Sequence, residues 1–153
     1  MGRSVHPYDD TAVIDSRAPR TNQAVIGTLA LLAFVVDAQW LIALLALQFI
    51  LGLTLGRRWC LPCLLYFEVI QPRIGEGRIE DARPPRFANQ IGAVFLSVAT
   101  ISFLAGAATF AWVLALIVST LALFSAMSGV CLSCEMYVLI ARARGMQLER
   151  YPV

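Results

Sequence analysis

Two long apolar stretches, residues 23–56 and 91–130, limit what this chain can fold into more than any other feature. They contain 34 and 40 residues, and Asp37 is the one charged residue in either. About 20 residues of α-helix cross the hydrocarbon core of a bilayer, which is roughly 30 Å thick. Each stretch is therefore long enough for a helical hairpin, and we expect turns near residues 37–40 and 106–108. This predicts an all-α integral membrane protein with four transmembrane helices.

The composition agrees with a membrane protein of one domain. Of the 153 residues, 59% are hydrophobic and 14% are charged, and the mean hydropathy is +0.72. A soluble core of this size does not need so much apolar surface. The first twenty residues are polar and lack the pattern of a secretory signal, so we expect the apolar stretches to remain in the mature protein. The chain has no phosphate loop, nucleophile elbow or nucleic-acid-binding motif, so nucleic acid is not an expected partner.

Arginines predict the orientation in the membrane. The chain has no lysine, and a pair of arginines lies on each side of both apolar stretches, while neither expected turn has a basic residue. The pairs are Arg17 and Arg20, Arg57 and Arg58, Arg83 and Arg86, and Arg142 and Arg144. Basic residues are enriched in cytoplasmic loops. We therefore expect a multi-pass protein of the bacterial inner membrane with both termini and the central loop in the cytoplasm.

The two halves of the chain repeat one another. Residues 15–20 and 81–86 both read DxRxPR, and residues 60–66 and 131–137 both read CLxCxxY. Matched motifs in the same order indicate duplication of a unit with two crossings, and such units form a parallel repeat about an axis along the membrane normal. Both CxxC pairs should then lie at equivalent positions on one side of the membrane, close to each other.

We divide the chain accordingly, as two parallel-repeat helical hairpins with a short interfacial helix after each CxxC. The segments are a polar cytoplasmic tail (1–20), a first hairpin repeat ending in CLPC (21–70), an Arg-rich cytoplasmic linker (71–88), a second hairpin repeat ending in CLSC (89–145) and a C-terminal tail (146–153).

The first CxxC pair, Cys60 and Cys63, is our primary candidate for chemistry. Pro62 fits the first turn of a helix, so a helix beginning there would leave Cys60 at its N-terminus. There the helix dipole and the adjacent Arg57 and Arg58 would favour the reactive thiolate. We therefore expect Cys60 to attack a disulfide or accept persulfide sulfur, and Cys63 to resolve the product.

The second pair, Cys131 and Cys134, is expected to be less acidic. It has Ser133 in place of the proline, and Glu135 in place of the arginines. We expect this second pair to receive electrons or sulfur from the first pair. Because the cytosol is reducing, all four thiols should be free at rest.

Other roles for the cysteines remain open. Cysteine is small and apolar, and it also serves simply in packing. The chemistry proposed above requires no cofactor, but four thiolates brought together by a parallel repeat would suit a tetrathiolate zinc or iron–sulfur site. A non-catalytic membrane scaffold subunit is a further alternative.

The DxRxPR segments also have two interpretations. Arg17, Arg20, Arg83 and Arg86 can anchor the chain to anionic lipid headgroups. They would alternatively form a paired anion site at two helix N-termini, suited to sulfate, thiosulfate or a persulfide carrier. The first interpretation is favoured because arginines at this depth are expected from the orientation alone.

Two runs resemble a known family. Residues 129–137 read GVCLSCEMY and residues 85–92 read PRFANQIG. With these runs the chain, from about residue 15 to residue 140, resembles the bacterial membrane family called domain of unknown function 4395. Genes for thiosulfate-sulfurtransferase-like or thioredoxin-like proteins often neighbour members of that family. The resemblance therefore implies thiol or sulfur chemistry with a soluble partner of one of those classes.

The sequence thus predicts a cytoplasm-facing dithiol site in a lipid bilayer. Its expected chemistry is thiol–disulfide exchange or sulfane-sulfur transfer with a thioredoxin-like or sulfurtransferase partner. The sequence has no feature that specifies an oligomeric state.

Overall fold

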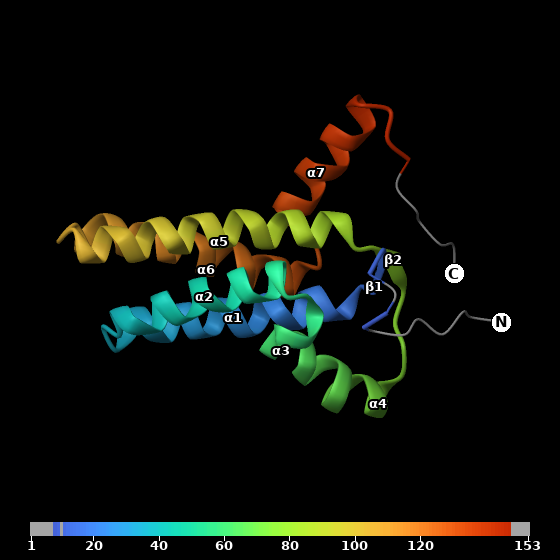
Figure 1. The fold of residues 1–153 in the computed structure, drawn as a ribbon, viewed down its shortest axis with the longest axis horizontal. Coiled ribbons are helices and arrows are strands. Elements are labelled where there is room, and N and C mark those ends of the chain that lie inside the picture. The colour runs from blue at the N-terminus through green and yellow to red at the C-terminus, as the bar shows by residue number, and fades with distance from the viewer. Residues whose placement is uncertain (1–7, 10, 148–153) are drawn as a thin grey trace.

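Four long helices form the body of the protein. The computed structural model describes residues 8–9 and 11–147. The long helices are α1 (Arg17–Val35), α2 (Gln39–Thr54), α5 (Arg83–Leu104) and α6 (Ala108–Ser128). They lie side by side as a bundle, with the two hairpin turns at one end (Figure 1). The most extensive contacts join α1 to α6 and α2 to α5, so each hairpin packs chiefly against the other one.

The two hairpin turns lie where the sequence predicts them. Residues 36–38 join α1 to α2, and residues 105–107 join α5 to α6. Both turns contain a residue with a positive backbone φ, Asp37 at 52° and Gly106 at 82°. Glycine adopts such angles without steric cost, and aspartate is among the few other residues that tolerate them.

Short elements gather at the opposite end of the bundle. Two strands, β1 (Val13–Asp15) and β2 (Ile79–Asp81), precede the long helices α1 and α5. After α2 the chain forms a 3₁₀ turn (Arg57–Trp59), α3 (Leu61–Leu65), a π-helical turn (Tyr66–Ile70) and α4 (Gln71–Ile74), and after α6 it forms α7 (Leu132–Ala143). Helices α3 and α7 therefore begin directly after Cys60 and Cys131, and they leave the bundle on opposite sides (Figure 1). In the described residues, the regular secondary structure is helical apart from this small sheet.

The sheet joins the two repeats symmetrically. β1 and β2 are antiparallel, with Val13 opposite Asp81, Ile14 opposite Glu80 and Asp15 opposite Ile79. Asp15 and Asp81 are the first residues of the two DxRxPR motifs. Each of them lies opposite the residue two positions before the other aspartate, so the pairing is symmetric. The aspartates also act alike: each accepts a hydrogen bond from the backbone N–H two residues later. The pairing relates the repeats by a local two-fold axis.

Small side chains let the long helices approach closely. The buried core of the bundle contains seven alanines and a few larger residues, among them Ile26, Ile42, Leu96 and Phe49. At Gly27 a Cβ would lie 2.8 Å from Leu123 Cγ, so α1 and α6 are in contact there. Small residues serve the same purpose in helices packed within membranes.

The prediction of four transmembrane helices is wrong. Within the described residues, two helices, α5 and α6, are long and apolar enough to cross a membrane. Helix α2 has 16 residues, about 24 Å at 1.5 Å per residue, which is shorter than the hydrocarbon core. Helix α1 begins with polar turns that contain Arg17 and Arg20, so its uninterrupted apolar part starts only at Ala24. Residue counts along the apolar stretches overestimated the helices because they included turns and polar ends.

The surfaces of α5 and α6 indicate association with a membrane. Only 28% of each apolar segment is buried inside the structure, whereas a core helix of a soluble protein is mostly buried. Large apolar side chains point outward along both helices, including Ile101, Leu104, Phe124 and Met127. Exposed apolar surface of this extent requires an apolar environment or a partner.

Candidate functional site

Both CxxC pairs have the same local backbone. Cys60 precedes α3 with φ −90° and ψ 101°, and Cys131 precedes α7 with φ −92° and ψ 110°. In each case the cysteine carbonyl accepts a hydrogen bond of 2.9 Å from the N–H four residues later, which closes the first helical turn. Pro62 lies in the first turn of α3, as predicted. The sequence thus correctly located both pairs at helix starts.

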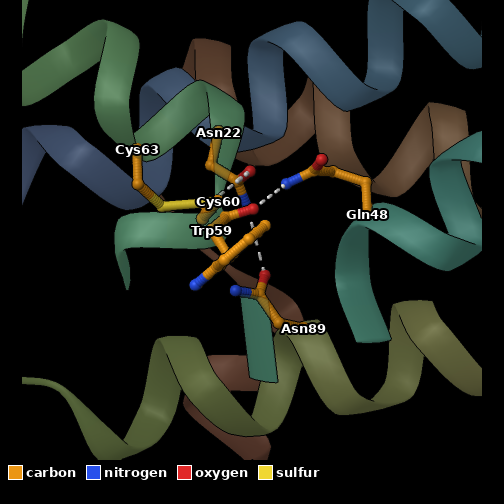
Figure 2. The surroundings of a disulfide bond; sticks show 6 residues. All are labelled: Asn22, Gln48, Trp59, Cys60, Cys63 and Asn89. Atoms are coloured by element: carbon orange, nitrogen blue, oxygen red, sulfur yellow. Dashed lines mark hydrogen bonds between the residues drawn. A yellow bond between two sulfur atoms is a disulfide. The ribbon is translucent and has the colours of Figure 1, made fainter. Parts of the chain in front are cut away.

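The first pair is oxidised and buried. A disulfide joins Cys60 to Cys63, with Cα atoms 5.1 Å apart, and each cysteine is 8% exposed. The disulfide lies in a small apolar cluster with Ala18, Tyr66 and Phe67. Figure 2 shows its polar surroundings, with Asn22 Oδ1 at 3.9 Å from Cys60 Sγ. The expectation that all four thiols are free is therefore wrong for this pair.

The arginines next to Cys60 point to other groups. Arg57 donates from Nη2 to the carbonyl oxygens of Val13 at 2.7 Å and Thr11 at 3.3 Å. The Arg58 guanidinium carbon lies 5.4 Å from the centre of the Tyr8 ring. Arg57 thus binds backbone carbonyls in and just before β1, a contact that adjacency in sequence does not reveal. The predicted activation of Cys60 by these arginines stays a prediction.

The second pair is reduced, and its sulfurs interact. Cys131 and Cys134 are free and partly exposed. Cys134, in the first turn of α7, offers its thiol and its backbone N–H to the Cys131 sulfur. Gln23 Nε2 donates to the same sulfur at 3.3 Å, and Ser125 Oγ donates to Gln23 Oε1 at 2.6 Å. Cys131 is therefore surrounded by hydrogen-bond donors.

These donors divide the two thiols into an acidic and a non-acidic one. The pKa of Cys131 is lowered to about 6. The Cys134 thiol makes the largest contribution, followed by the Cys134 backbone N–H, Gln23 and Ser125, whereas partial burial acts in the opposite direction. The pKa of Cys134 is raised, first by its hydrogen bond to Cys131, then by burial and by the negative charges of Cys131, Glu135 and Glu80. Cys131 is thus a thiolate at neutral pH while Cys134 keeps its proton. We expected the second pair to be less acidic than the first, and this comparison stays a prediction because Cys60 and Cys63 form a disulfide and do not titrate.

The four DxRxPR arginines contact four separate parts of the chain. Arg20 lies directly against Gly129, at the C-terminal end of α6, and Arg86 Nη2 lies 3.4 Å from the carbonyl oxygen of Leu53, near the end of α2. Cations are favourable at helix C-termini. Arg17 packs against Gly77, and Arg83 Nε lies 3.6 Å from Asp81 Oδ1. The paired anion site stays a prediction.

The cysteines do not converge on a metal ion. Among residues 8–9 and 11–147, no group of three or more His, Cys, Asp or Glu side chains is arranged to hold one. All four cysteines belong to that part of the chain. The two pairs instead contact successive residues of α1, Asn22 for Cys60 and Gln23 for Cys131.

Sequence reasoning overlooked Gln23 and Ser125 as residues of the site. Gln23 belongs to an Asn–Gln pair that recurs at Asn89 and Gln90, and Ser125 is a polar residue within an apolar helix. Buried polar side chains in a helix need hydrogen-bond partners. That requirement applies to the buried Ser125 and less strictly to the half-buried Gln23, but it does not name the partner.

Comparisons with known proteins agree with the resemblance seen in the sequence. No curated protein and no solved structure matches the chain. The family described as "Domain of unknown function (DUF4395)" matches residues 14–142, a range that includes both CxxC pairs and all the long helices. The chain belongs to this family.

Proposed function

We propose that this protein exchanges thiols and disulfides through Cys131 and Cys134, at the cytoplasmic face of a bacterial inner membrane. The observation that carries the proposal is a pair of free, partly exposed cysteines at the start of α7, with Gln23 Nε2 donating to Cys131 Sγ at 3.3 Å. The lowered pKa of Cys131 and the raised pKa of Cys134 agree with it. A thiolate is the nucleophile in exchange, and a neighbouring thiol resolves the product.

The soluble partner is proposed to be a thioredoxin-like or sulfurtransferase protein. Cys131 Sγ attacks one sulfur of the partner's disulfide, that S–S bond breaks, and the second partner sulfur leaves as a thiolate that takes up a proton. Cys134 then loses its proton and attacks Cys131 Sγ, which releases the first partner sulfur. The partner gains two electrons as a dithiol, and Cys131 and Cys134 become a disulfide.

Sulfane-sulfur transfer would use the same nucleophile. Cys131 Sγ attacks the outer sulfur of a partner persulfide, the persulfide S–S bond breaks, and the partner's thiolate leaves. Cys131 then carries the persulfide. The first pair is not the nucleophile in this scheme because Cys60 and Cys63 are buried in a disulfide.

The proposed orientation rests on α5, α6 and their flanking arginines. Arg83 and Arg86 lie at the start of α5, Arg142 and Arg144 lie at or after the end of α7, and the turn at residues 105–107 has no charge. Basic flanks favour the cytoplasm. A hairpin of α5 and α6 would then return the chain to the cytoplasm directly before Cys131.

Trapping of mixed disulfides tests the function. Membranes containing the wild-type protein, Cys131→Ser, Cys134→Ser or Cys60→Ser are reduced, washed and mixed with an oxidised thioredoxin-like protein. We expect Cys134→Ser to accumulate a mixed disulfide, Cys131→Ser to form none, and Cys60→Ser to react as the wild type does.

Three outcomes would contradict the proposal. Exchange at the wild-type rate by Cys131→Ser would exclude Cys131 as the nucleophile. Loss of reactivity after treatment with a chelator would favour the metal-binding alternative. Thiols of the second pair that no disulfide or alkylating agent modifies would favour a scaffold.

A further inference from the structure

Two successive hydrogen bonds link Ser125, Gln23 and Cys131. Ser125 Oγ on α6 donates to Gln23 Oε1 at 2.6 Å, and Gln23 Nε2 on α1 donates to Cys131 Sγ at 3.3 Å. The amide of glutamine has an acceptor end and a donor end. In this arrangement the serine hydroxyl donates to the oxygen and the nitrogen faces the sulfur.

The amide orientation decides which form of Cys131 is favoured. An N–H donor stabilises a thiolate, whereas a carbonyl oxygen at the same place would stabilise the protonated thiol. Ser125 is 3% exposed, so water competes little for its hydroxyl. The contact between Ser125 and Gln23 is therefore well placed to hold the amide in one orientation.

The residue before Gln23 presents the opposite end of its amide to the first pair. Asn22 Nδ2 donates to Asn89 Oδ1 at 3.2 Å, which leaves Asn22 Oδ1 facing Cys60 Sγ at 3.9 Å (Figure 2). An amide oxygen disfavours a thiolate at Cys60 once the disulfide is reduced. Two successive residues of α1 thus distinguish the two pairs electrostatically.

We propose that Gln23 is a positioning residue for the second repeat's thiol site, that Ser125 sets its orientation, and that the two together favour Cys131 over Cys60 as the nucleophile. This inference rests on the proposed function. It also gives the duplication a role, because the first repeat supplies the donor for a cysteine of the second repeat.

The pH dependence of alkylation at Cys131 tests the inference. The full-length protein in native membranes is treated with iodoacetamide at a series of pH values, and modification of the Cys131 peptide is followed by mass spectrometry. The variants are Gln23→Met, which keeps the length of the side chain without a donor, and Gln23→Glu, which still accepts from Ser125. Gln90→Met is the matched control, since Gln90 is the repeat counterpart of Gln23 and is exposed.

We expect both Gln23 variants to raise the pKa of Cys131 by about one, since a hydrogen bond to a charged group has about that effect. Alkylation near pH 6 would then slow about fivefold while the rate above pH 9 stays unchanged. An unchanged rate at high pH separates a lost donor from a disturbed fold. Ser125→Ala should shift the profile in the same direction by a smaller amount, and Gln90→Met should not shift it.

Two results would overturn the inference. An unchanged profile in both Gln23 variants would mean that the amide does not stabilise the thiolate, and a lowered pKa would mean that its oxygen faces the sulfur. Neither result depends on a partner protein. Conversely, shifted profiles in a protein that forms no mixed disulfide would refute the proposed function and leave the positioning role intact.

Discussion

At the scale of residues, the second CxxC pair combines one acidic and one non-acidic thiol within a single helical turn. Cys131 accepts hydrogen bonds from Cys134 and Gln23, and each of them stabilises negative charge on its sulfur. Cys134 keeps its proton because ionising it would place two negative charges side by side. An attacking and a resolving thiol need this difference.

Removal of the Cys134 thiol should make Cys131 less acidic. The thiol of Cys134 makes the largest contribution to the lowered pKa of Cys131, so Cys134→Ala should raise that pKa from about 6 toward the ordinary value of about 8.5. In the wild type, alkylation should slow as the pH falls through 6 because the thiolate takes up a proton. In the variant this decline should begin at higher pH.

Ser133→Ala is the control for this prediction. Ser133 lies between the two cysteines, yet it is not among the groups that shift either pKa. An identical pH profile for Cys134→Ala and the wild type would show that Cys134 does not stabilise the Cys131 thiolate.

At the scale of elements, the contact between α1 and α6 holds Gln23 beside Ser125 and Cys131. Ser119 Oγ donates to the backbone carbonyl of Gly27 at 2.8 Å, and Gly27 lies against Leu123. Both contacts lie within two turns of Gln23. The position of the amide donor therefore depends on close packing of these two helices.

A larger residue at Gly27 should separate α1 from α6. A Cβ there would lie 2.8 Å from Leu123 Cγ and 3.2 Å from Ala122 Cβ, so Gly27→Val should lower the free energy of unfolding by about 1–3 kcal/mol. Thermal unfolding in detergent measures the loss. Thr28→Val, at an exposed position of the same helix, should have little effect, and equal stability of the two variants would contradict the close contact.

At the scale of the whole molecule, the two repeats complete one another. Asn22 and Asn89, which occupy matching positions in the repeats, are joined by a hydrogen bond, and the strands before them pair in a symmetric register. Yet one pair is a buried disulfide and the other a reduced, partly exposed dithiol. Duplication has thus produced similar backbones with different side-chain surroundings.

Labelling from outside the cell tests the proposed orientation. A cysteine introduced at Ala107, in the turn between α5 and α6, should react with a membrane-impermeant maleimide added to intact cells, because basic flanks keep the other end in the cytoplasm. A cysteine at the exposed Glu76 should react only after the cells are opened. The reverse pattern would place the cysteine pairs outside the cytoplasm.

Features that depend only on neighbours along the chain were predictable from the sequence. The turns follow from interruptions in the apolar stretches, and Pro62 suits the first turn of the helix that follows Cys60. Family membership likewise follows from local motifs. Counting apolar residues was less reliable, because the length of a helix also depends on where its polar end begins.

Tertiary contacts give the two cysteine pairs different surroundings. Gln23 and Cys131 are 108 residues apart in sequence, and Gln23 and Ser125 are 102 apart. Likewise, Arg57 is three residues from Cys60 but binds backbone carbonyls in and just before β1. The charge state of a thiol depends on the donors and charges within a few ångströms of it. Packing of α1 against α6 brings those donors to Cys131, and adjacency in sequence cannot substitute for that contact.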